Sequence, residues 1–383
     1  MKVACVWGEA RSLDRISFRH EHLIAGFRAL GHEPFLVTAR DLVGRYDGPL
    51  DAVDDLAELA RPESWNRRAY DCAVAVTWLG MVPLLRALEA AGVPRVAIAD
   101  SDGQLGYAAH PGAAWQRLYP KQTTLRERVR AVRYFARRYV AGRARRDEED
   151  LRYVASAAHS SRIAFGSSEA IACWRRFLRQ QGAEALAERA FVAPFPVPEE
   201  FCDAPPVAKE DRVVAIGRWS DPQKDAPLLA AALERFLARG RATRVQIFGA
   251  DGAAAFGDLA GRFPALEIAG IQEPPVVRVA LAASRVVLFA SRWETGPHAA
   301  GEALVSGATL VSPPMPNFSG WTAGGAFGEV SANRSARALA DALGAELGRW
   351  DRGERDAAAI ATRWRERLHP RAFAAALAAS LAG

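Results

Sequence analysis

Two glutamates stand eight positions apart in the stretch RWETGPHAAGEAL, which covers residues 292–304. Glu294 closely follows an apolar run, and Glu302 lies among small residues. Carboxylates accept hydrogen bonds, so this pair is suited to holding the hydroxyl groups of a sugar. A glutamate on a helix is more often a solvated surface residue. The interpretation therefore depends on what surrounds the pair.

Two cations follow another apolar run, RVVAIG at 212–217. Arg218 comes directly after it, and Lys224 stands six residues later, just before a predicted helix. Pro297 suits the first position of a helix that begins after Glu294, because its missing N–H is not needed there. The start of a helix presents unpaired N–H groups and partial positive charge. Together these groups predict a site for an anion such as a diphosphate.

Apolar runs alternate with helical patterns along the whole chain. The runs at 2–7, 33–39, 72–76, 95–100 and 162–168 predict one set of strands, and those at 212–217, 244–249, 266–270, 285–291 and 309–314 predict a second. Apolar strands separated by helices are typical of parallel sheets covered on both faces. Ligands of such sheets bind beyond the carboxyl ends of the strands, where the residues above are expected.

Five prolines within 191–207 predict an extended linker between the two sets of strands. The predicted fold class is α/β, with two Rossmann-like domains facing across a cleft. The first domain is expected over residues 1–200, and the second over 207–365.

The segments GRWSDPQKD, RVQIFGADG and 266–312 resemble the donor-binding half of retaining glycosyltransferases of the GT-B fold, similar to glycosyltransferase family 4. Those enzymes carry a glycine–arginine element followed by a lysine, here Gly217, Arg218 and Lys224. They also carry an E-x7-E motif, here Glu294 and Glu302. The resemblance implies the GT-B fold, with the last helix, in 366–383, crossing back to the first domain.

The resemblance also implies a donor, a nucleotide-diphosphate sugar, and a reaction that needs no metal or other cofactor. Arg218 and Lys224 would neutralise the diphosphate and stabilise the leaving group, Glu294 would contact the sugar hydroxyls, and Glu302 would bind the ribose. The leaving phosphate would act as base in a front-face transfer with retention. The other implied donor contacts are Gly8, Gly217, Ile271, Gln272, Thr295, Gly296, Pro297 and His298, and the implied sugar or acceptor contacts are Arg11, Asp100 and Asp102. The acceptor stays open between a glycan, a lipid-linked molecule and a small natural product.

Two other functions remain as alternatives. A catalytically inactive nucleotide-sugar-binding or scaffold protein of the same fold is one, because Gly8 stands alone where the family often has two glycines and Pro297 takes a place that is often glycine. A two-domain NAD enzyme is the other, but no GxGxxG follows a predicted strand.

Residues 117–146 contain eleven lysines and arginines and a single acidic residue, Glu127. Leu125, Val129, Val132 and Ala136 form an apolar stripe at helical spacing beside a stripe of arginines. Such a helix fits an anionic membrane surface or an anionic acceptor. It equally fits a helix packed on the sheet with a solvated arginine face. Nucleic acid is not predicted as a partner, because no helix-turn-helix, RNP or finger pattern is present.

Composition bears on the partner and on the cellular location of the protein. The formal net charge of +6 agrees with an anionic partner. No stretch approaches eighteen apolar residues, so no membrane-spanning helix is predicted. The first apolar run is too short for a signal peptide. The four cysteines form no CxxC pair and no metal-ligand spacing, which favours a reducing compartment. The expected location is the cytoplasm, with the inner membrane face as one site within it.

Overall fold

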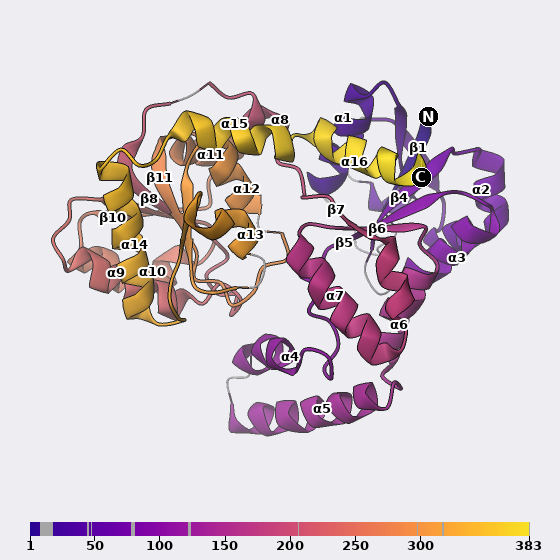
Figure 1. Ribbon diagram of the computed structural model, residues 1–383, viewed down its shortest axis with the longest axis horizontal. Helices are drawn as coiled ribbons and strands as arrows, with labels where there is room; N and C mark the ends of the chain where they lie inside the picture. The colour runs from indigo at the N-terminus through magenta and orange to yellow at the C-terminus, as the bar shows by residue number, and fades with distance from the viewer. Residues whose placement is uncertain are drawn as a thin grey trace. The chain divides into compact units, whose positions relative to one another are not determined.

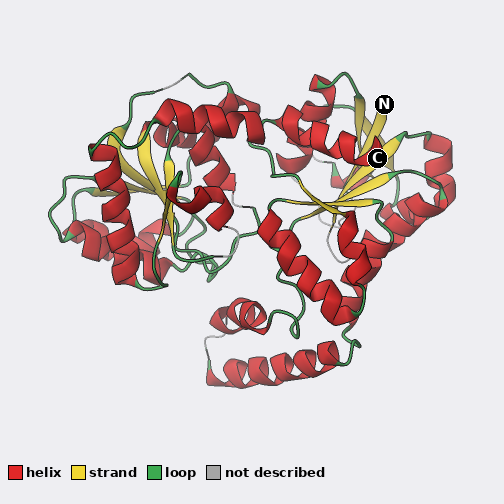
Figure 2. Cartoon of the chain, in the orientation of Figure 1, coloured by secondary structure: helices red, strands yellow, loops and turns green. Residues whose placement is uncertain are grey.

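The computed structural model describes residues 1–7, 18–43, 46, 48–77, 81–121, 124–205, 207–296, 298–315 and 318–382. The chain forms two compact units (Figures 1 and 2). Unit 1 consists of Met1–Pro196 and His369–Gly383, and unit 2 consists of Val197–Leu368. Each unit is an α/β structure with its own parallel sheet, so the predicted fold class is confirmed.

The sheet of unit 1 has the order β3-β2-β1-β4-β5-β6-β7 among the described residues. Its strands are β1 (Lys2–Val6), β2 (Glu33–Ala39), β3 (Leu50–Val53), β4 (Cys72–Thr77), β5 (Arg95–Ala99), β6 (Arg162–Phe165) and β7 (Ala190–Val192). The central strand β1 is almost wholly apolar, and Val3 to Val6 are fully buried. This is the pattern expected of a parallel strand covered on both faces.

Helices cover both faces of this sheet. The described helices of unit 1 are α1 (Phe18–Ala29), α2 (Pro62–Arg68), α3 (Val82–Ala90), α4 (Pro111–Leu118), α5 (Leu125–Arg143), α6 (Glu148–Ala158), α7 (Ser168–Gln181) and α16 (Pro370–Ala382). One core cluster joins β1 to α1 and α16, and another joins it to α3 and to Trp65 on α2. Cys5 and Cys72 lie buried in the first cluster.

The last helix of the chain, α16, packs against α1 near the other end of the sequence. A Cβ atom on Gly26 would lie 2.2 Å from the carbonyl oxygen of Pro370, so this close approach requires glycine. Phe373 and Leu377 join Phe27 in the same buried cluster. The C-terminal helix therefore returns to the first unit, as predicted.

Helices α4 and α5, called here the arm, stand at the ends of α6 and α7 that are farther from the sheet (Figure 1). Trp115 of α4 makes an edge contact with Phe135 of α5, with ring centroids 5.3 Å apart. The apolar stripe predicted for α5 does not pack on the sheet: Leu125 is 78% exposed and Val132 is 49% exposed. The interpretation of α5 as an ordinary sheet-covering helix is therefore wrong.

The proline-rich segment contains the boundary between the two units, as predicted, but it is not extended throughout. Its start pairs with β6 as the edge strand β7, and the one-turn helix α8 (Glu199–Cys202) lies within it. Phe195 and Phe201 are buried, in unit 1 and unit 2 respectively. The described prolines, Pro194, Pro196, Pro198 and Pro205, lie outside helices and strands, where no backbone N–H donor is needed, while the aromatic residues between them pack.

The sheet of unit 2 has the order β10-β9-β8-β11-β12-β13 in the described part of the chain. Its strands are β8 (Glu210–Ile216), β9 (Arg244–Phe248), β10 (Leu266–Gly270), β11 (Ser284–Leu288), β12 (Thr309–Ser312) and β13 (Gly328–Val330). The covering helices are α9 (Ala226–Leu237), α10 (Gly252–Arg262), α11 (Pro274–Ala283), α12 (His298–Val305), α13 (Phe318–Thr322), α14 (Ala336–Asp351) and α15 (Ala357–Leu368). A single large core cluster runs through both faces.

No helix in the described ranges combines the length and the apolar character needed to cross a bilayer.

Candidate functional site

The carboxyl end of β8 is fixed against the neighbouring strand β9. The N–H of Gly217 donates to the Phe248 carbonyl at 3.1 Å, and the indole N–H of Trp219 donates to the same oxygen at 2.9 Å. Gly249 has φ +105°, and a Cβ there would lie 2.0 Å from the carbonyl oxygen of Gly217. Only glycine allows the two strand ends to approach this closely.

The loop after β8 is bound to the loop after β11 by three consecutive residues, Gln223, Lys224 and Asp225. The Gln223 carbonyl accepts from the N–H of Arg292 at 2.7 Å, and its side-chain amide donates to the Trp293 carbonyl at 2.8 Å. Strands β8 and β11 are neighbours in the sheet, so their carboxyl ends lie side by side. The two loops therefore form one structural unit.

Lys224 and Glu294 meet at the centre of these loops. The Lys224 Nζ lies 2.6 Å from Glu294 Oε1, and the Gln223 amide donates to Oε2 at 3.3 Å. The Glu294 side chain is 7% exposed and that of Lys224 is 20% exposed. A buried charge needs such a partner, because removing one member of a buried ion pair typically costs about 3–5 kcal/mol. The pair therefore fixes the position of a lysine and a carboxylate at the carboxyl ends of two inner strands, β8 and β11.

Two further ion pairs, both made by the buried Asp225, stabilise the same loops. Asp225 Oδ2 lies 3.0 Å from Arg292 Nη2 and 2.8 Å from Arg334 Nη2. Arg334 also donates to the Ser291 carbonyl at 2.8 Å. The sequence analysis singled out Lys224 but missed Gln223 and Asp225. Their position directly before α9 could have indicated a role, because residues that follow β8 lie next to the carboxyl end of the neighbouring strand β11.

Arg218 lies at the same strand end but is engaged differently. Its side chain is 75% exposed, and its guanidinium lies 3.3 Å from Asp221 in an exposed pair. Exposed pairs of this kind contribute little to stability. The guanidinium can therefore turn toward an anionic ligand at small cost, which Lys224, held by Glu294, cannot do as freely.

The residues that join β11 to α12 follow Glu294 directly. Thr295, Gly296 and His298 are half-buried, and α12 begins at His298. The start of a helix carries partial positive charge that favours a bound anion. Pro297, Gly8 and Arg11 lie outside the described residues.

Glu302 stands in the second turn of α12 and is half-buried. Burial raises the pKa of its carboxyl group to about 7, and the nearby charge of Glu200 raises it further in the same direction. A carboxyl group with this pKa is partly protonated near neutrality, so it can both donate and accept hydrogen bonds.

The residues after β10 are exposed. Ile271 is 77% exposed, and the side-chain amide of Gln272 donates to the Ala269 carbonyl at 2.6 Å. Gln272 thereby closes the turn that follows the strand. Ile271 therefore presents an apolar side chain to solvent just beyond the carboxyl end of β10.

In unit 1, Asp100 and Asp102 follow β5, and both are buried. Asp102 accepts from the Gln104 N–H at 3.0 Å and pairs with the guanidinium of Arg117 on α4. Asp102 therefore anchors the arm to the carboxyl end of β5.

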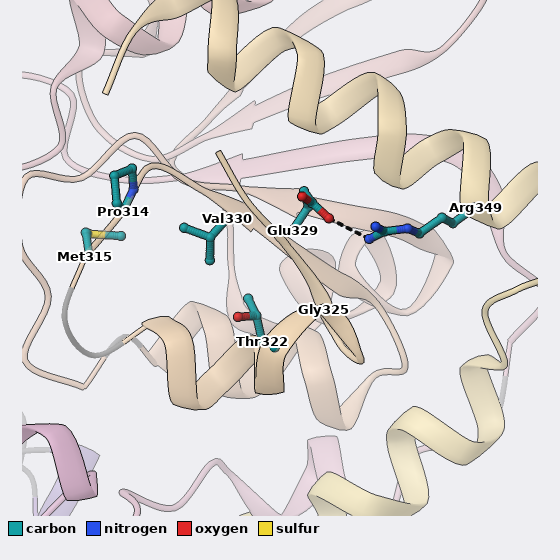
Figure 3. Close-up of a pocket in the computed structure, with 8 residues that line it drawn as sticks. Pro314, Met315, Thr322, Gly325, Glu329, Val330 and Arg349 are labelled. Atoms are coloured by element: carbon teal, nitrogen blue, oxygen red, sulfur yellow. Dashed lines mark hydrogen bonds and ion pairs between the residues drawn. The ribbon is translucent and has the colours of Figure 1, made fainter. Parts of the chain in front are cut away.

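A pocket of about 710 Å³ opens beside β13 in unit 2 (Figure 3). It is lined by Pro314, Met315, Thr322, Gly324, Gly325, Glu329, Val330 and Arg349. The two charged residues in it, Glu329 and Arg349, are already paired at 2.6 Å. Because its charges are compensated, this pocket suits an anion less than the exposed Arg218 does. The sequence analysis did not identify it, since none of its residues follows a recognised motif.

Comparison with known proteins identifies the unit that carries these loops. Residues 210–347 match the family model described as glycosyl transferases group 1. This range includes both strand exits, the Lys224–Glu294 pair and helix α12. No curated protein matches the sequence.

Solved structures match over nearly the whole chain. Anabaena HepE in complex with UDP aligns over 100% of both chains, with a TM-score of 0.65 and 15% identity. A glycosyltransferase from Rickettsia africae covers 99% of this chain and 97% of its own, with a TM-score of 0.66 and 10% identity. Sucrose-phosphate synthase from Thermosynechococcus elongatus covers 99% of this chain and 97% of its own, with a TM-score of 0.63 and 15% identity. These matches establish the GT-B fold that the resemblance implied. The match of residues 210–347 to the group 1 glycosyl transferase model agrees with the donor-binding half to which the sequence was compared.

Proposed function

We propose that this protein is a retaining glycosyltransferase that moves a sugar from a nucleotide-diphosphate sugar to a hydroxyl group of an acceptor. The observation that carries the proposal is the Lys224–Glu294 pair, held between two adjacent strand exits within the group 1 glycosyltransferase domain. A cation and a carboxylate fixed 2.6 Å apart suit a ligand with a phosphate next to a polyhydroxyl ring.

In this proposal the donor diphosphate lies over the start of α12, between Lys224 and Arg218. Lys224 is preorganised by Glu294, so its charge requires little reorganisation when negative charge develops on the leaving group. Arg218 turns from its exposed pair with Asp221 to the same phosphates. These two cations supply the positive charge that the departing diphosphate needs, so the proposed reaction requires no metal ion.

Glu294, held in place by Lys224 and Gln223, contacts the sugar hydroxyls through its carboxylate, which acts as hydrogen-bond acceptor. Glu302 contacts the ribose, where its raised pKa lets the carboxyl group act as donor or acceptor. The departing phosphate oxygen takes the proton of the acceptor hydroxyl as the new glycosidic bond forms on the face that the leaving group vacates. The C–O bond to phosphate breaks, and the anomeric configuration is retained.

UDP-glucose is the first donor to test, because Anabaena HepE has been solved in complex with UDP-glucose. Purified protein would be incubated with UDP-glucose and with a panel of other nucleotide sugars, and release of nucleoside diphosphate would be measured. We expect turnover of at least one donor, lowered about a hundredfold or more in Glu294→Gln, the typical cost of removing one transition-state contact.

The matched control is Glu273→Gln. Glu273 is an exposed acid that precedes α11, after the exit of β10 in the same sheet. We expect it to retain wild-type turnover. Nucleotide-sugar binding without release of diphosphate by the wild type would favour the inactive binding protein. Equal rates in Glu294→Gln and the wild type would contradict the proposed role of the pair.

A further inference from the structure

Helix α5 buries one face and exposes another. Its buried residues are Ala131, Arg138 and Gly142. Phe135 lies on the same side and contacts Trp115 and Tyr107, with ring centroids 5.3 and 5.6 Å away. This inward face connects α5 to α4 and to the loop after β5.

Another face of α5 is an exposed apolar stripe, called here the outward stripe. It consists of Leu125, Val129, Val132, Ala136 and Val140, all exposed in the structure. At about 100° per residue these positions fall within about 80° of arc, centred about 130° around the helix from the inward face. Leu125 and Val140 are 78% and 66% exposed, so the stripe is apolar over most of the length of the helix.

Arginines run along one edge of the outward stripe. Four exposed arginines occupy adjacent positions on the helix surface: Arg126, Arg130, Arg133 and Arg137. Of the acidic residues nearby, Glu127 caps the helix start and Asp147 pairs with the buried Arg138. The result is an apolar stripe bordered by cationic side chains.

We propose that the outward stripe docks on the surface of a membrane rich in anionic lipids. The helix would lie in the plane of the interface, with its apolar side chains at the level of the upper acyl chains and its arginines on the lipid phosphates. A helix of this length extends about 28 Å along the surface, enough to contact several headgroups.

Charge distinguishes this occupant from others. A second copy of the chain docked through the same face would bring two rows of arginines together, and the repulsion opposes such a dimer. Nucleic acid would attract the arginines but would leave Leu125, Val129 and Val140 without an apolar partner. An anionic bilayer satisfies both the apolar stripe and the arginine row.

The arm is fixed to unit 1, so docking would also orient that unit. Arg138 pairs with Asp147 and, at 2.9 Å, with Glu149 at the start of α6. Arg117 on α4 donates to the Gln104 carbonyl at 2.9 Å and pairs with Asp102 beyond β5. The membrane-facing stripe is therefore held in a set orientation to the strand end where acceptor contacts are expected.

The test is co-sedimentation of the full-length protein with vesicles. Vesicles of phosphatidylglycerol mixed with phosphatidylcholine should bind the protein, and vesicles of phosphatidylcholine alone should bind it at least about tenfold more weakly, since about fivefold is lost for each arginine that lacks its anionic partner. The double variant Val129→Asp/Val132→Asp should bind the mixed vesicles at least about tenfold more weakly than the wild type does.

The matched control is Val276→Asp/Val279→Asp. These two valines are also three positions apart and exposed, at 48% and 64%, but they lie on α11 in unit 2. The control should bind mixed vesicles like the wild type, and both double variants should unfold at the wild-type temperature. Equal binding to the two kinds of vesicle, or equal loss of binding in both double variants, would overturn the proposal. So would a protein that dimerises without lipid and loses its dimer in Val129→Asp/Val132→Asp.

Discussion

Two regions of this molecule use charged residues in opposite ways. At the exits of β8 and β11 in unit 2, Lys224 and Glu294 are paired and largely removed from water. Along α5 in unit 1, arginines line an exposed apolar stripe. Paired, preorganised charges suit a small ligand whose charge develops at one point. A row of exposed cations suits an extended anionic surface. The arrangement of the charges, more than their number, separates a catalytic site from a docking surface.

The largest effect is expected from Lys224→Met. This change removes a cation from the proposed diphosphate site and leaves the buried carboxylate of Glu294 without its 2.6 Å partner. We expect kcat for donor turnover to fall about a thousandfold, the upper range for one preorganised charge contact. Steady-state assays on the donor identified above would measure it.

The control for this change is Arg244→Met, at the amino end of β9. Arg244 forms an exposed pair with Glu267 and stands at the opposite end of the sheet from the strand exits. Wild-type kcat is expected. A comparable loss in Arg244→Met would show that the effect comes from the net charge of unit 2, and not from the site.

Arg138→Met should loosen the arm without affecting unit 2. Arg138 is buried, its Nη2 donates to Asp147 Oδ1 at 2.6 Å, and its guanidinium lies 4.6 Å from the ring centroid of Tyr107. Removing the cationic partner of a buried carboxylate such as Asp147 typically costs about 3–5 kcal/mol. Hydrogen exchange should become faster across α5 and stay unchanged across α12. Unchanged protection of α5 would mean that other contacts hold the arm.

Glu302 should make stability depend on pH. Its pKa is about 7 in the folded protein, raised from the ordinary 4.5 by burial and by Glu200. Between these values the folded chain holds a proton that the unfolded chain has released, so the free energy of unfolding falls as pH rises through this window, by about 3 kcal/mol in total. Glu302→Gln should remove this fall.

Urea unfolding across the same window would measure the effect of Glu302. The variant and the wild type should be equally stable near pH 4, and the variant should be more stable near pH 8 by about 3 kcal/mol. Parallel pH profiles for the two proteins would show that Glu302 does not carry the shifted pKa.

The smallest effect on stability is expected from Arg130→Gln on the arm. Arg130 is exposed on α5, so the free energy of unfolding should change by less than about 0.5 kcal/mol. Thermal unfolding would check this. A loss well above that value would mean that Arg130 has a structural partner and is not part of an open docking surface.

The fold was largely predictable because its strands are continuous apolar runs. The strands that the sequence did not reveal are β3, β7 and β13, which are three or four residues long and lie at or near sheet edges. Such strands carry half-exposed residues and give no apolar run. The end of β7 was hidden for a second reason, since it overlaps a proline-rich segment that is typical of linkers.

The site was predictable in its residues but not in its contacts. The spacing of Glu294 from the strand exit indicated a functional group, yet nothing in the sequence showed that Lys224 would pair with it. That pairing depends on the adjacency of β8 and β11, which are separated in the chain by two other strands. The apolar stripe of α5 shows the same limit, because periodicity predicts an amphipathic helix but not which side its neighbours cover.

The claim that the β8 and β11 exits hold a diphosphate can be tested most directly by comparing nucleoside diphosphates with the corresponding nucleosides. UDP, GDP and ADP, and their nucleosides, would be titrated against the thermal stability of the wild type and of Arg218→Ala. One diphosphate at about a hundred times its dissociation constant should stabilise the wild type by about 2.7 kcal/mol, with its nucleoside far weaker. That advantage should shrink in Arg218→Ala. Equal stabilisation by diphosphate and nucleoside in the wild type would contradict the account.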